Sequence, residues 1–144
     1  MTVTTDRATG VADDPRDLVS PETFDKITDF LVTRHRVTRR YAERVFAQTL
    51  VFLKAVADNP DIRIVPDISV DPGWHAFIEH TIEYAEFCDP VAGRFLHHVP
   101  IMIEDIGSGA VMARTIPALH ATGYQVDMEF WETGESCCPP QPCF

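Results

Sequence analysis

The apolar pattern of residues 71–88 constrains the fold most, because it is the clearest helical repeat in the chain. From Trp74 onward, apolar or small residues recur at the i, i+3, i+4, i+7 spacing of one buried helix face. They are Phe77, Ile78, Thr81, Ile82, Ala85 and Cys88. Asp71 can cap this helix and Pro72 suits its first turn. The helix should be interrupted at Asp89-Pro90, since a residue before proline avoids the α conformation.

Two further helices are expected before this one. Ser20 can cap the first, and Thr38 can cap a second, of about 20 residues, that ends before Asn59-Pro60. After the helix of residues 71–88, the apolar pattern predicts a short helix over 91–98. It also predicts a helix from a Ser108 cap to about Thr122, with Gly123 at its C-terminal end. Alternating apolar residues over 62–70 and 124–131 predict two short strands that pair.

The predicted fold class is therefore mainly α, a compact helical bundle with one small two-stranded β element and disordered termini. A length of 144 residues suits one domain. We expect residues 1–18 to form a flexible N-terminal arm, residues 19–132 a single helical domain and residues 133–144 a Cys/Pro-rich C-terminal tail.

The net charge disfavours some classes of binding partner. Twelve Lys and Arg residues against 22 Asp and Glu give a formal charge of −10, so neither nucleic acid nor an anionic membrane is an expected partner. No apolar run approaches the roughly 20 residues that span a bilayer, and no signal peptide is evident, which predicts a cytoplasmic protein. The basic run over 34–40 suits a helix C-terminus, with a phosphate or acidic-partner site as the alternative.

Helical geometry limits any metal site in residues 71–100, which hold four of the six histidines. His75 and His80 point about 140° apart on one helix and cannot chelate the same ion. His80 and Cys88 share a flank but lie about 12 Å apart along the axis. A site in the body therefore needs a histidine from a later segment. The alternative is that these histidines cap, hydrogen-bond or pack.

The later histidines and the tail cysteines supply the remaining candidates. A turn at Asp89-Pro90 would bring His97 or His98 back toward His80, and the tail holds three of the four cysteines. Imidazoles and thiolates together bind zinc or copper. The candidate metal ligands are His80, Cys88, His97, His98, Cys137, Cys138 and Cys143.

The string WHAFIEHTIEYAEFC followed by GRFLHHVP resembles small bacterial proteins of the glycine-rich domain-containing family. The matching residues are Trp74, His75, His80, Tyr84, Phe87, Cys88, Gly93, Arg94, Phe95, His97 and His98. Larger relatives carry Trp-His-x-His, whereas Phe77 stands at the last of these positions here, which removes one candidate ligand. The resemblance implies a family without an established reaction.

Three functions remain open. The first is an intracellular protein that binds or handles a metal through His and Cys residues. The second is a non-catalytic interaction or scaffold protein with a protein partner. The third is a docking domain whose C-terminal Cys-rich peptide is modified by a partner enzyme. An enzyme is not favoured, because the chain lacks HExxH, a phosphate loop, a G-x-S-x-G elbow and a dinucleotide fingerprint.

The number of ligands that a metal site needs leads to a testable prediction about the C-terminal cysteines. A structural zinc site needs four N or S ligands, and the body offers too few in this interpretation. The sequence thus predicts that tight binding depends on Cys137, Cys138 and Cys143. Deleting residues 136–144 should abolish stoichiometric binding while circular dichroism shows an intact helical body; full-affinity binding by the truncated chain would place the site in the body.

Overall fold

The computed structural model describes residues 11–99 and 110–132, which form a helical bundle around one central helix. Its helices are α2 (Pro21–His35), α3 (Arg39–Asp58), α4 (Asp71–Glu79), α5 (Thr81–Ala92) and α7 (Ala110–Ala121), with short 3-10 helices η1 (Pro15–Leu18) and η2 (Met128–Phe130). The mainly α fold class is confirmed. The predicted Ser108 cap, the first ten residues of the predicted arm and the cysteine tail lie outside the described residues.

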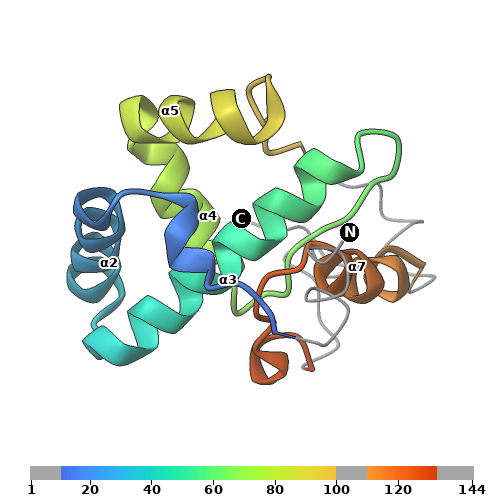
Figure 1. Ribbon diagram of the computed structural model, residues 1–144. Coiled ribbons are helices and arrows are strands. Elements are labelled where there is room, and N and C mark those ends of the chain that lie inside the picture. The colour runs from blue at the N-terminus through green and yellow to red at the C-terminus, as the bar shows by residue number, and fades with distance from the viewer. Residues whose placement is uncertain (1–10, 100–109, 133–144) are drawn as a thin grey trace.

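Helix α3 is the centre of the bundle. It crosses the middle of the molecule and contacts α2, α4, α5, α7 and η1 (Figure 1). Its fully buried side chains include Phe46, Leu50, Val51, Phe52 and Leu53. A helix buried on several sides is stabilised mainly by the apolar area that its neighbours remove from water.

The predicted caps of the first two helices are confirmed. Ser20 Oγ accepts a hydrogen bond from the Thr23 N–H at 3.1 Å, and Thr38 Oγ1 accepts one from the Tyr41 N–H at 3.1 Å. These bonds satisfy amides that a helix N-terminus leaves without a partner. Among the described helices, none has the length and apolar content needed to cross a lipid bilayer.

Helix α4 approaches α3 closely at Gly73. A Cβ added at Gly73 would lie 2.0 Å from Thr49 Oγ1 on α3, so a larger residue would force the helices apart. The Thr49 hydroxyl is buried and donates to the Val45 carbonyl at 2.9 Å. This contact sets the position of the first turn of α4, which carries Asp71 and Trp74.

The helix predicted to run from Asp71 to Asp89 breaks at His80 and not at Asp89-Pro90. The His80 N–H bonds the Phe77 carbonyl at 3.0 Å, which leaves the Ala76 carbonyl without its helical donor. The His80 side chain replaces that donor, because its Nδ1–H donates to the Ala76 carbonyl at 2.7 Å. The histidine therefore ends α4 and turns the chain into α5.

Helix α5 continues through Pro90 to Ala92, so the predicted interruption at Asp89-Pro90 and the predicted short helix over 91–98 are both wrong. Pro90 lacks the amide that would bond the Glu86 carbonyl, but Glu86 is exposed, and water can satisfy its carbonyl. Gly93 then adopts the left-handed φ of 68° that ends many helices. Residues 95–99 follow without regular structure.

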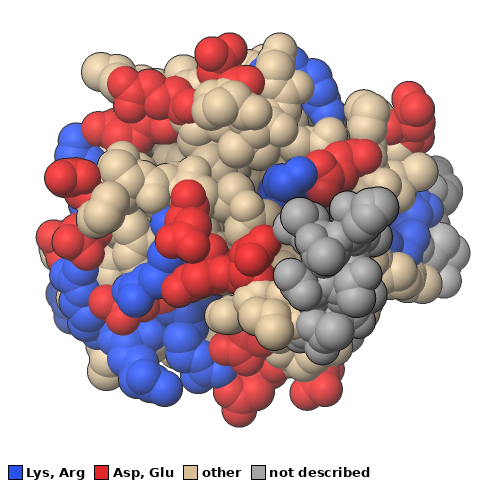
Figure 2. All heavy atoms as spheres, in the orientation of Figure 1, with Lys and Arg blue, Asp and Glu red and all other residues tan. Residues whose placement is uncertain are grey.

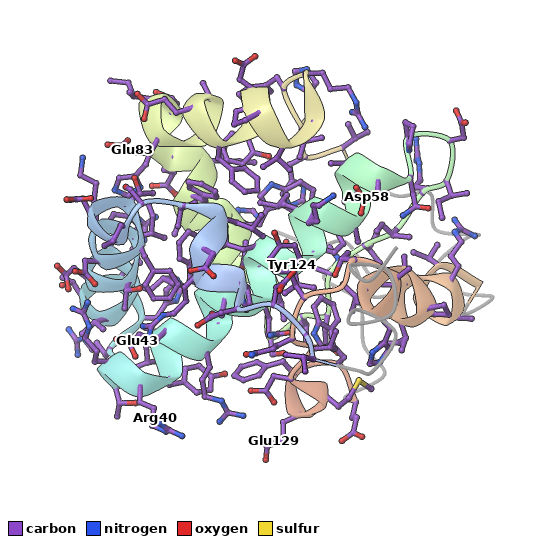
Figure 3. All side chains as sticks on the ribbon, in the orientation of Figure 1. Arg40, Glu43, Asp58, Glu83, Tyr124 and Glu129 are labelled. Carbon is purple, nitrogen blue, oxygen red and sulfur yellow. The ribbon has the colours of Figure 1, made fainter. Side chains whose placement is uncertain are left out.

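The predicted two-stranded element is absent from the described residues. Tyr124 (labelled in Figure 3) instead forms an isolated parallel bridge with Asp13, and Met128–Phe130 forms η2. Buried Gln48 on α3 supplies the hydrogen bonds that a second strand would give. Its Nε2 donates to the Gln125 carbonyl at 3.2 Å, and its Oε1 accepts from the Asp127 N–H at 3.1 Å.

Spacing in the sequence predicts that Trp74, Phe77, Tyr84 and Phe95 form one aromatic core with α3, and the structure confirms this except at Phe95. Trp74, Phe77 and Tyr84 are buried, and the Trp74 ring lies 5.2 Å from that of Phe52 on α3. Phe95 was expected in this core but is 41% exposed, because it follows the left-handed turn and contacts Tyr84 from the edge of the core.

Replacing Trp74 by Ala should lower the free energy of unfolding by about 3–5 kcal/mol, since it leaves a cavity against α3. Phe95→Ala should cost on the order of 1 kcal/mol, because that ring already meets solvent. Urea unfolding followed by far-UV circular dichroism measures both. Equal midpoints for the two variants would contradict this placement of Trp74.

Candidate metal centre

The first turn of α4 presents a carboxylate and an imidazole on one face. Asp71 and His75 are four residues apart, so their side chains lie one above the other on the helix. The Asp71 Oδ2 atom lies 2.8 Å from His75 Nε2. Asp71 does not cap α4 as the sequence predicted: the N-cap is Val70, which makes no side-chain capping bond. The Asp71 carboxylate is therefore available for side-chain partners.

Asp67 explains why the helix can begin without a cap from Asp71. The Asp67 carbonyl accepts from the N–H groups of Val70 and Asp71 at 2.9 and 3.1 Å. Its side-chain Oδ1 accepts from both the N–H and the hydroxyl of Ser69 at 3.0 Å. The turn before α4 thus satisfies its own amides, and Asp71 is directed elsewhere.

His98 reaches the same carboxylate from the segment that follows α5. Its Nε2 lies 3.1 Å from Asp71 Oδ1, so the two carboxylate oxygens each face one imidazole nitrogen. The His98 ring stacks on Trp74 with centroids 4.0 Å apart and an interplanar angle of 22°. It meets the His75 ring edge-on at 4.8 Å. Packing therefore fixes the orientation of His98.

A buried hydrogen-bond chain holds the His98 segment against the core. Trp74 Nε1 donates to the Tyr84 hydroxyl at 3.0 Å, and that hydroxyl donates to the Leu96 carbonyl. Burial raises the pKa of Tyr84 above its ordinary value, so the hydroxyl stays protonated as a donor. Leu96 lies two residues before His98, and this chain therefore positions the histidine over α4.

Together, Asp71, His75 and His98 form a triad suited to a metal ion. One ligand atom from each lies within 4.8 Å of the other two, and in residues 11–99 and 110–132 no other group of three His, Cys, Asp or Glu residues meets this condition. Two imidazoles and one carboxylate are a donor set of non-haem iron and catalytic zinc sites. The side chain of His75 is 59% exposed and that of Asp71 only 14%, so the site opens to solvent on one side.

Of the ligands predicted from the sequence, the triad includes His98 alone. His80 is engaged at the end of α4 and meets the Phe30 ring edge-on at 4.9 Å. The His97 ring lies 4.8 Å from that of Phe95. Cys88 is buried in the core, and Cys137, Cys138 and Cys143 lie outside the described residues.

The sequence analysis did not identify Asp71 and His75 as candidate ligands. The signal was present as an Asp-x-x-x-His spacing at a predicted helix start, but Asp71 was interpreted as a cap and His75 was compared only with His80. A pair at i, i+4 is common on helices, so this spacing alone does not indicate a site. The third residue of the triad, His98, comes from a different segment of the chain.

The basic run over 34–40 is a second surface feature, and Figure 2 shows basic residues gathered on the lower left of the molecule. Two of its guanidinium groups, those of Arg34 and Arg39, are engaged by nearby carboxylates. Arg34 pairs with Glu79 at 3.4 Å, and Arg39 pairs with Asp25 at 2.9 Å and Glu43 at 3.3 Å. These pairs are exposed to solvent, so each contributes little to stability.

Comparison with known proteins identifies a family. The family described as UCP032817-like matches residues 19–108, which is more than half of the chain, so the protein belongs to this family. The matched range contains all three residues of the triad. This match does not confirm the glycine-rich naming or the motif expected from the resemblance. No curated protein and no solved structure matches the chain.

Cys88 should be a packed and unreactive thiol. Burial raises its pKa, so the fraction of reactive thiolate at neutral pH falls. In a Cys137→Ser, Cys138→Ser, Cys143→Ser variant, Cys88 should resist iodoacetamide at pH 7 and react fully in denaturant. Mass spectrometry of the alkylated chain checks this, and rapid alkylation of the folded protein would contradict the burial.

Proposed function

We propose that this member of the UCP032817-like family binds one divalent transition-metal ion through Asp71, His75 and His98. The observation that carries the proposal is the shared carboxylate, whose two oxygens lie 2.8 and 3.1 Å from the Nε2 atoms of the two histidines. An ion would bind the neutral form of each imidazole and replace the Nε2 protons.

A purely stabilising hydrogen-bond cluster accounts for this arrangement less well. His75 is mostly exposed, and exposed pairs contribute little to stability.

The donor set defines a class of metals. Imidazole nitrogens with one carboxylate suit first-row divalent ions such as iron, nickel, copper and zinc, which include the zinc and copper expected from the sequence. Three protein ligands leave at least one coordination position for water or a small molecule. The formal charge of −10 also favours the approach of a cation. The proposed role is therefore metal binding with an accessible ion.

Titration of the metal-stripped, untagged full chain with Zn²⁺ in competition with a chromogenic chelator tests the proposal. The wild type should bind one equivalent. His75→Gln should weaken binding by at least about tenfold, since even outer-shell losses cost about 10–100-fold. Asp71→Asn and His98→Gln should do the same. His75→Gln is the sharpest variant, because its exposed side chain can change without loss of the fold.

Two controls separate the triad from other ligands. His97→Gln removes the histidine beside His98 and should leave the affinity unchanged. The Cys137→Ser, Cys138→Ser, Cys143→Ser variant should also retain one equivalent. Loss of binding in that variant alone would assign the site to the tail, as the sequence predicted. Absence of binding in the wild type would leave a scaffold function as the better explanation.

A further inference from the structure

A cavity of about 350 Å³ lies beside the proposed metal centre. It is bounded by Val56 near the end of α3, by residues 60–66 and by residues 97–99, with Trp74 on its wall. Its size is at the lower end of the range of about 300–1,000 Å³ that small-molecule sites occupy. The cavity can thus hold a compact organic molecule.

The cavity and the triad share His98. This histidine lines the cavity and also directs its Nε2 to Asp71. The Trp74 ring that stacks on His98 belongs to the same wall. A molecule that fills the cavity therefore lies against the ring of one residue of the triad.

The lining indicates the chemistry of the molecule. Eight of the twelve residues that line the cavity are apolar, among them buried Ile64 and Val65 and the 45% exposed Ile62. The polar ones are Asp61, Arg63, His97 and His98. A divalent ion held by one carboxylate and two neutral imidazoles retains one positive charge. An anionic oxygen donor offsets that charge, and the apolar side chains of the lining, Ile62 and Trp74 among them, favour an uncharged body.

We infer that the centre takes a small monoanionic oxygen-donor ligand with an apolar body, which coordinates the ion and packs into the cavity between Trp74 and Ile62. This inference rests on the proposed metal site. It adds the class of ligand that the ion would hold, and it applies to carboxylates and hydroxamates alike because both present anionic oxygen.

Visible absorption of the Co²⁺-loaded full chain tests the ligand class, because the cobalt spectrum responds to a change of its ligands. Acetohydroxamate and benzohydroxamate serve as probes with the same donor and different bodies. Both should change the spectrum, and benzohydroxamate should bind about tenfold more tightly, the gain expected from burying a phenyl ring.

Two matched variants locate the body of the probe. Ile62→Gln should remove most of the preference for benzohydroxamate while cobalt binding stays unchanged. Ile68→Gln should keep the preference, since Ile68 is 43% exposed but does not line this cavity. Equal affinity for the two probes, or a preference untouched by Ile62→Gln, would overturn this inference and leave the metal site standing. Failure of Co²⁺ to bind would overturn both.

Discussion

The close approach of α4 to α3 at Gly73 is the contact on which the candidate site depends. Because the Thr49 hydroxyl lies where a Cβ would stand, the two helices can meet at this distance only with glycine. That approach buries Trp74 against α3 and places Asp71 at the edge of the core. A helix moved outward by one side chain would carry both residues away from the segment that brings His98.

Buried and half-buried polar side chains control the irregular parts of the structure. Gln48 binds the main chain before η2, and Asp67 satisfies the turn before α4. His80 binds the carbonyl that its own helix break exposes. In each case, a side chain supplies a hydrogen bond that regular structure would otherwise supply, since buried main-chain groups are costly without partners. Such segments can then depart from helix and strand geometry.

The candidate centre joins a rigid part and an accessible part. Asp71 and His98 are largely shielded and held by packing, whereas His75 meets solvent. A preorganised pair with one exposed ligand allows an ion to enter without unfolding the site. The stacked Trp74 and His98 rings also line the neighbouring cavity, so the ring that orients this candidate metal ligand also shapes the cavity.

The sequence by itself determined the mainly α fold, the caps at Ser20 and Thr38 and the extent of α3, because these depend on bonds between residues three or four positions apart. It also contained the Asp71–His75 spacing, which is too common to identify a site. Only the tertiary structure decided the break at His80, the exposure of Phe95 and the arrival of His98 at Asp71, 27 residues away along the chain. The physical reason is that these outcomes depend on how closely separate helices pack, which local periodicity does not encode.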